Sequence, residues 1–437
     1  MNTMQSNIIQ IAINKIKTHL SQLQRESIIA IIGIALEYYN IFLFGYLTSV
    51  IISQFFNASN PLLIVLAILL SYIMGPLGAI ICGHVGDVRG RKKILAWTIA
   101  FVSIPSFLIS ILPTYDQIGI AASIFFIILR SIQTMAFGGD AVGLVTFILE
   151  DAPARHRGLF GGFMSMGAAI GVLFSSLVIS LIDPLGDSIS PWKWRIPLSL
   201  GIFGVIASIY FYRTFGETET FKHYKEKHYI KTWPLIDLFK KSKLVFLKVI
   251  GITALVPIIT IIIFGFVPYL GMTHLGLSPK LSMWSNTLAV GLFAIFAPFF
   301  GSLSDKIGRR PILFGVSLIF LTLGFPLFSL LDHATTPMFF SIQLFFALVS
   351  SAYYGVTMTI CIENFPTHIR YTGVALGYYI TYALFGGING LYLVKLLIKN
   401  IPIDTSPVFY LLSGSVIVFL SALFLTEKKK QSLIDTR

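Results

Sequence analysis

The sequence predicts an all-α membrane protein with twelve transmembrane helices, and three observations carry this prediction. Of the 437 residues, 55% are hydrophobic and only 12% are charged, whereas a soluble protein has about 25% charged residues. The hydrophobic residues fall in runs of the roughly 20 residues that an α-helix needs to cross a bilayer. The basic residues lie mostly between alternate runs. A chain of this composition cannot cover its own surface with polar groups and needs a lipid environment.

Twelve apolar runs are long enough to span the membrane. In chain order they are residues 28–52, 61–84, 94–112, 117–139, 159–182, 195–213, 248–271, 282–303, 312–331, 337–361, 371–396 and 407–425. The first run is too long for a signal-peptide core and has no obvious small-residue cleavage site, so we interpret it as a retained helix.

The longest hydrophilic stretch, residues 213–243, divides the runs six and six. This division predicts five parts: an N-terminal tail (1–27), a six-helix bundle (28–213), a linker (214–247), a second bundle (248–425) and a C-terminal tail (426–437). Part of the linker is expected to form a helix on the inner membrane surface.

The distribution of charge predicts the orientation. Most of the 32 Lys and Arg residues lie in the tails, the linker and the loops after helices two, four, eight and ten. The positive-inside rule therefore predicts that both termini are cytoplasmic. The net charge of +13 is then a topology signal with some contact to anionic lipids, and no nucleic-acid partner is expected. Cys82 and Cys361 predict neither a disulfide framework nor a metal site.

The two halves of the chain repeat one another. "GHVGDVRGRKK" (83–93) follows helix two, and "GSLSDKIGRRP" (301–311) follows helix eight. "EDAPARHRG" (150–158) and "ENFPTHIRYTG" (363–373) follow helices four and ten, with Glu, Pro and Arg at the same spacing. These echoes indicate a duplicated six-helix unit, an architecture typical of secondary transporters.

These motifs resemble those of the major facilitator superfamily. "EYYNIFLFGY" (37–46), "ILRSIQTMAFGGD" (128–140) and "WKWRIP" (192–197) are similar to its metabolite:proton symporter branch, which includes proline/betaine, α-ketoglutarate, citrate and shikimate carriers. The chain departs from the branch at two positions: Asn40 replaces the usual acid in helix one, and Asp140 replaces the usual Glu in helix four.

The resemblance implies two bundles around a central cavity and uptake by alternating access. It also implies a bacterial inner-membrane location, a functional monomer, a small-molecule substrate, and a proton gradient in place of a cofactor.

Two charged residues are predicted at mid-membrane. Glu37 is about 15 Å from the inner end of helix one, and Arg130 is roughly 20 Å from the outer end of helix four, at 1.5 Å per residue. Charges at this depth are costly unless they face a polar cavity or each other. Asn40 and Gln133 each follow at i+3 and share a face with them. A second interpretation is a structural ion pair that locks helices one and four together.

The predicted substrate and proton site adds aromatic residues to these four. Its members are Glu37, Tyr38, Tyr39, Asn40, Arg130, Gln133, Tyr353 and Tyr354. Tyr353 and Tyr354, from helix ten, have ordinary packing as an equal alternative. Lys395, near the outer end of helix eleven, is expected to reach the interface by snorkelling.

The paired loop motifs predict a cytoplasmic gate. Asp87 and Asp305 lie at helix C-termini, where the helix dipole is already negative and nearby arginines compensate. The predicted gate comprises Asp87, Arg91, Asp140, Glu150, Arg157, Asp305, Arg309, Arg310, Glu363 and Arg370. The resemblance implies that this gate is closed in the outward-open state; the alternative is that these charges only set topology. Gly138, Gly139 and Gly143 are interpreted as a place where helix four bends or ends.

The preferred function is therefore proton-coupled uptake of a zwitterion such as proline or betaine. One cation beside one carboxylate suits a zwitterion, whose ammonium group aromatic rings can hold by cation–π contact. Two alternatives are a mono- or dicarboxylate:proton symporter and a non-transporting receptor or lipid-handling protein with this fold. An enzyme is not expected, because no nucleotide loop, metal cluster or nucleophile–base set is present.

Overall fold

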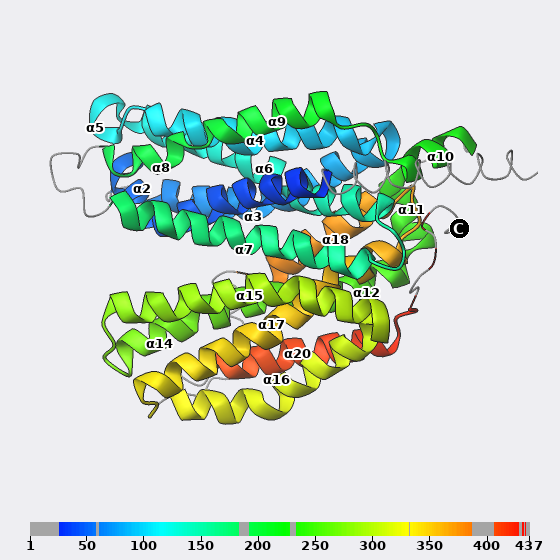
Figure 1. Cartoon of the computed structure of the whole chain (residues 1–437). Helices are drawn as coiled ribbons and strands as arrows, with labels where there is room; N and C mark the ends of the chain where they lie inside the picture. The colour runs from blue at the N-terminus through cyan, green and yellow to red at the C-terminus, as the bar shows by residue number, and fades with distance from the viewer. Residues whose placement is uncertain are drawn as a thin grey trace, which may run out of the picture.

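The computed structural model describes residues 26–57, 61–182, 192–227, 233–331, 333–386, 406–427, 431 and 433. Within these residues the secondary structure is entirely helical. Two helical bundles lie side by side, one from each half of the chain (Figure 1).

The first bundle contains the predicted helices one to six. It begins with the helix Glu26–Tyr46. The elements that follow are α2 (Thr48–Phe55), α3 (Pro61–Arg89), α4 (Arg91–Ile111), α5 (Tyr115–Ile118), α6 (Ile120–Asp151), α7 (Arg157–Ile182), α8 (Arg195–Ser199) and α9 (Ile202–Thr214).

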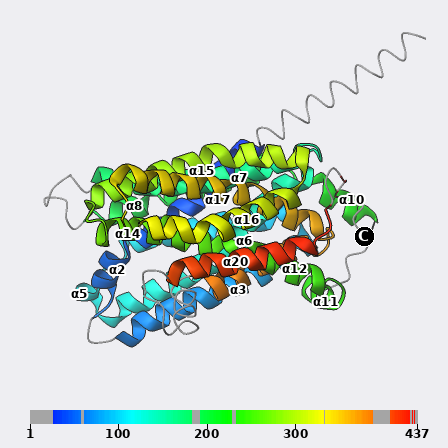
Figure 2. The same ribbon diagram turned by 90° about the horizontal axis from the view of Figure 1, so that it is seen from below.

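The linker forms two short helices, α10 (Glu219–Lys227) and α11 (Pro234–Lys241). Both lie at the end of the molecule that also holds the C-terminus (Figures 1 and 2). We call this the closed end; it is the end that the charge distribution predicts to be cytoplasmic.

The second bundle mirrors the first. Its elements are α12 (Lys243–Thr253), α13 (Leu255–Ile261), η3 (Ile262–Phe266), α14 (Val267–Thr273), α15 (Pro279–Ile307), α16 (Arg309–Leu331), α17 (Thr336–Asn364), α18 (Arg370–Phe385) and α20 (Ser406–Leu423). The predicted helix seven corresponds to α12, α13, η3 and α14 together. The π-helical turn η3 interrupts it, and such turns often mark functional sites.

Ten helices within the described residues are long and apolar enough to cross a membrane. The eleventh predicted span is described only as far as residue 386, and the twelfth corresponds to α20. Lys395, residues 1–25 of the N-terminal tail and most of the C-terminal tail lie outside the described residues. Large apolar side chains such as Leu62 and Ile295 are more than 70% exposed, as expected for faces that contact lipid.

The glycines of helix four do not end it, because α6 continues from Ile120 to Asp151. They allow close packing instead. A Cβ atom on Gly138 would lie 2.1 Å from the carbonyl oxygen of Gly75 on α3, so small residues here let two helices touch through their backbones.

Candidate functional site

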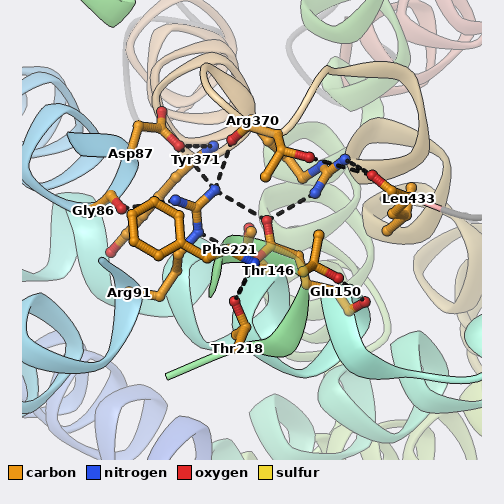
Figure 3. A network of polar contacts seen from close by, with 12 residues as sticks. Gly86, Asp87, Arg91, Thr146, Glu150, Thr218, Phe221, Arg370, Tyr371 and Leu433 are labelled. Carbon is orange, nitrogen blue, oxygen red and sulfur yellow. Dashed lines mark hydrogen bonds and ion pairs between the residues drawn. The ribbon is translucent and has the colours of Figure 1, made fainter. Parts of the chain in front are cut away.

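A network of buried ion pairs joins the two halves at the closed end (Figure 3). Arg91 donates from Nε and Nη2 to the two oxygens of Glu150, at 3.1 and 3.0 Å. Arg370 of the second half donates to Glu150 Oε1 at 2.8 Å. Asp87 lies 3.2 Å from Arg91. Charges out of water are stable only when paired, so these four side chains, the first network, depend on one another.

A second network has the same arrangement of ion pairs, with the roles of the two halves of the chain exchanged. Arg309 lies 2.9 Å from Asp305 and 3.0 Å from Glu363. Arg157 of the first half lies 3.2 Å from the same carboxylate. All four side chains are buried. The duplication predicted from the sequence therefore appears as two equivalent clusters.

Each network also crosses between the halves through a helix N-terminus. Asp87 accepts the backbone N–H groups of the second and third residues of α18, at 3.2 and 2.9 Å. Asp305 accepts the corresponding N–H groups of α7, at 2.9 and 3.0 Å. These donors have no partner within their own helix, and the positive end of the helix dipole favours a carboxylate there. Four ties of this kind close this end of the molecule.

The linker and the segment after α20 strengthen the closure in parallel ways. Glu217 accepts the backbone N–H of Arg91 at 3.0 Å, and Glu427 accepts that of Arg309 at 2.7 Å. Thr218 donates its hydroxyl to Glu150 at 3.0 Å. Burial raises the pKa of the Glu217 carboxyl above its usual range, opposed by the N–H groups that it accepts.

Two residues near the C-terminus also contact the gate arginines. The carbonyl oxygen of Gln431 accepts from Arg157 at 3.2 Å, and that of Leu433 accepts from Arg370 at 3.4 Å. The side chain of Leu433 is buried. One arginine belongs to each half, so this segment bridges the junction.

Two adjoining cavities lie between the helices, further from the closed end. Both are lined by Tyr38, Phe42, Thr260 and Tyr382. The first also reaches Tyr354 and Asn286 of the second half. The second reaches Arg130 and Gln133 of the first half. Thr260 is the residue just before the end of α13, so the π-helical turn that follows borders the cavities.

Arg130 is the charged residue among the described lining of these cavities. Its guanidinium carbon lies 4.1 Å from the ring centroid of Phe44, and its Nη1 donates to Gln133 Oε1 at 2.6 Å. Gln133 in turn donates to the carbonyl oxygen of Val102 at 3.0 Å. Arg130 is thus held by an aromatic face and an amide, and no carboxylate among the described residues forms an ion pair with it.

Glu37 has a different partner from the one expected. It is buried, and its carboxyl group lies close to that of Asp140 on α6. Asp140 Oδ1 accepts from the hydroxyl of Thr98 at 2.8 Å. Both oxygens of Glu37, and Oδ2 of Asp140, have no donor among the described residues. The doubly charged form of two neighbouring carboxyl groups out of water is strongly disfavoured, so at least one of them is expected to hold a proton.

This arrangement corrects two sequence-based placements. No ion pair joins Glu37 to Arg130 within the described part of the chain, and Asp140 lies with Glu37 rather than in the gate networks. The cause is the length of α6, which extends twelve residues beyond the predicted end at residue 139. Measured from the closed end at 1.5 Å per residue, Asp140 is about 15 Å deep, whereas Arg130 is about 30 Å deep. Glu37 matches the former.

The other predicted residues are divided between cavity and packing. Tyr38 and Tyr354 line the cavities, and the hydroxyls of Tyr354 and Thr260 lie 2.8 Å apart. Tyr39 and Tyr353 are buried and donate to the carbonyl oxygens of Pro197 and Ile252, so both serve packing in this conformation.

Two more predicted residues bind backbone carbonyl groups. The amide nitrogen of Asn40 donates to the carbonyl oxygen of Leu36 at 2.9 Å. Arg310 binds the carbonyl oxygens of Ala422 and Leu423 at the end of α20, apart from the second network.

Several residues that line the cavities were not predicted from the sequence. Asn286, Tyr378, Tyr382 and Thr260 line the cavities but belong to no motif. Glu217 could have been recognised from the repeat, because a glutamate follows the last helix of each half within a few residues, at Glu217 and Glu427.

Comparison with known proteins agrees with this architecture. The family model described as "Sugar (and other) transporter" matches residues 27–232, and "Major Facilitator Superfamily" matches residues 244–436. The chain belongs to the major facilitator superfamily. The predicted all-α fold of two six-helix bundles is confirmed, and the protein is a membrane transporter rather than an enzyme.

Three similar proteins show the breadth of this relationship. The shikimate transporter of Escherichia coli K12 is 28% identical, over 94% of this chain and 96% of its own. The proline/betaine transporter of the same strain is 27% identical, over 92% and 83%. The solved proton:xylose symporter XylE superposes with a TM-score of 0.79 at 17% identity, covering 95% of this chain and 98% of its own, and shows the shared fold.

Proposed function

We propose that this superfamily member takes up a small zwitterion, such as proline or a betaine, together with a proton by alternating access. The cavity carries this proposal: one arginine, a group of tyrosines and a nearby buried carboxyl pair. The bound proton and the substrate then occupy neighbouring sites in the first half. We assign the closed end to the cytoplasmic side, so the protein is described in an outward-facing conformation.

The substrate assignment rests on the lining of the cavities. Arg130 offers a planar guanidinium group to a carboxylate. Tyr38, Tyr378 and Tyr382 offer aromatic faces, and such faces attract an ammonium group by cation–π interaction. A dicarboxylate needs a second cation, and the described lining supplies none.

The coupling assignment rests on the carboxyl pair. Glu37 and Asp140 hold one proton between them while the closed end excludes water. When the inner side opens and water enters, the proton passes to water and the two carboxylates separate. In this proposal the proton site, Glu37 with Asp140, is separate from Arg130, which binds the carboxylate of the substrate.

The test is transport by purified protein in liposomes. Wild-type protein is expected to accumulate labelled proline or betaine when a pH gradient, acidic outside, is imposed. Glu37→Gln removes the exchangeable proton but keeps the shape of the side chain, so it should retain substrate exchange and lose accumulation. Glu219→Gln, an exposed carboxylate on α10, is the matched control and should behave as wild type. Normal accumulation by Glu37→Gln refutes the coupling proposal.

A second substrate class is favoured by one comparison. The shikimate transporter is similar over nearly its whole length, and a hydroxylated monocarboxylate also suits one arginine among hydroxyl groups. Competition of labelled proline uptake by betaine and by shikimate separates the two classes. Arg130→Lys should weaken binding of either, because a lysine cannot form the paired hydrogen bonds of a guanidinium group.

A further inference from the structure

Tyr371 is a residue of the second half whose side chain is seated inside the first half. It is the second residue of α18 and is fully buried. A Cβ atom on Gly86 of α3 would lie 2.2 Å from its ring, and one on Gly143 of α6 would lie 2.1 Å from its hydroxyl oxygen. The glycines of these two helices therefore form a slot that the tyrosine fills at the closed end.

Tyr371 connects the proton site to the gate by two hydrogen bonds. Its hydroxyl donates to the carbonyl oxygen of Gly139 at 2.7 Å, and Gly139 directly precedes Asp140. Its backbone N–H donates to Asp87 at 3.2 Å, within the first network. One residue thus touches the helix segment that carries the carboxyl pair and the carboxylate that caps α18.

The second network lacks an equivalent. Gly158 holds the same place in α7 as Tyr371 holds in α18, and its N–H donates to Asp305 at 2.9 Å. It has no side chain, and α17 carries Tyr353 where α6 carries Asp140. A side chain at this place is therefore not needed to build the network, and it occurs beside the carboxyl pair.

We propose that Tyr371 is the positioning residue that makes closure of the inner side depend on protonation of the Glu37–Asp140 pair. The inference rests on the proposed proton coupling. With the proton present, the segment around Gly139 stays packed and accepts from Tyr371. When the proton passes to water, repulsion between the two carboxylates displaces this segment, and the tyrosine leaves its slot together with the N-terminus of α18. Asp87 then loses its N–H donors and the first network opens.

Other titratable groups also face the pair or the tyrosine. They are Tyr38 of the first helix, Cys82 and Asp87 of α3, and Tyr379 of α18. Phenol and thiol groups ordinarily titrate above pH 8, and Asp87 is paired with Arg91. The carboxyl pair is therefore the group expected to respond to pH.

The experiment measures the distance between spin labels at the closed end as a function of pH. Cysteines at Arg89 and Ile307, both exposed at the ends of α3 and α15, carry the labels, and the native cysteines are buried. Wild-type protein should shift from the short to the long distance as the pH rises. Tyr371→Phe keeps the ring but loses the hydroxyl, so its closed-to-open ratio at low pH should fall about fivefold, as expected for one buried hydrogen bond, and its pH response should flatten.

Tyr410→Phe is the control, because the buried hydroxyl of Tyr410 donates to the carbonyl oxygen of Phe385 at 2.7 Å within one half. It should keep the wild-type pH response. If Glu37→Gln abolishes the response while Tyr371→Phe keeps it at full size, the role of Tyr371 is disproved and the proposed coupling stands. If the wild type has no pH response, both proposals fail.

Discussion

The two gate networks have the same arrangement of ion pairs but differ in how many hydrogen bonds their charged groups make. In the first network, Glu150 accepts three hydrogen bonds from arginines and a fourth from Thr218. In the second, Arg309 and Arg157 share a single oxygen of Glu363. The Nε atoms of both arginines have no acceptor among the described residues. The two halves have therefore kept the same set of ion pairs, but the first network makes more hydrogen bonds than the second.

The interiors of the two halves differ more. Asp140 in α6 and Tyr353 in α17 are 213 residues apart, the same displacement as Glu150 and Glu363. The first half holds a carboxyl pair at this place, whereas the second half holds a tyrosine bonded to a backbone carbonyl. The proton chemistry is therefore expected in one half, and the other half contributes neutral lining. We therefore expect closure of the gate to need both halves and the proposed proton coupling to need only the first.

The largest expected effect comes from neutralising the network carboxylates. Breaking a buried ion pair costs about 3–5 kcal/mol, so both Glu150→Gln and Glu363→Gln should open the closed end. Glu150→Gln should have the larger effect, because it weakens more charged hydrogen bonds. Spin-label distances and thermal melting measure both. An equal or larger effect of Glu363→Gln contradicts the ranking.

A smaller effect is expected where the halves touch through glycine. A methyl group on Gly162 of α7 would lie 2.5 Å from the carbonyl oxygen of Ala297 on α15. Overpacking of this kind costs about 1–3 kcal/mol, so Gly162→Ala should favour separation of the halves. Gly291→Ala on α15 is the control, since nothing lies within 4 Å of its new Cβ atom. A wild-type distance distribution for Gly162→Ala would show that the interface can yield.

The smallest effect concerns Glu217 of the linker. Burial raises its pKa, so folding favours its protonated form. Its contribution to stability is full below the unfolded value of about 4.3 and is lost as the pH rises through the higher folded value. Glu217→Gln keeps an acceptor for the N–H of Arg91 and lacks this titration. Its melting temperature should therefore fall less than that of wild type as the pH rises above about 4.3.

Glu427→Gln is the matched substitution in the second half, at the N–H of Arg309. It tests whether loss of a carboxylate that accepts the first N–H of a helix changes the pH dependence of the melting temperature by itself. A profile of Glu217→Gln that parallels wild type means that another group governs this pH range.

Much of the gate was predictable because it is local in sequence. Asp87 and Arg91 are four residues apart in the sequence, and the same pair recurs at Asp305 and Arg309. Motif spacing therefore identified these residues. The glutamate partners were not predicted: proximity in sequence favours Arg157 for Glu150 and Arg370 for Glu363, whereas the structure pairs each glutamate with the arginine of the other half. Which arginine meets which glutamate depended on how the bundles are packed.

The proposed proton site was only partly predictable from the sequence. Glu37 stands out because a carboxylate in an apolar run is costly, but its partner depends on where α6 ends. Hydropathy marked that end too early, because the buried stretch from Asp140 to Glu150 carries charges that a lipid-exposed helix excludes. Buried protein surface tolerates such residues, and sequence alone does not distinguish it from an aqueous loop.

The sequence by itself determined the membrane-spanning helices, the duplication and the residue types at the gate, because hydrophobic length and charge placement are properties of the chain. Only the tertiary structure decided that Glu37 faces Asp140, that Arg130 faces the cavity and that Tyr371 enters the opposite half. These contacts join segments up to hundreds of residues apart, and Tyr371 can enter the opposite half because Gly86 and Gly143 have no side chains where it lies.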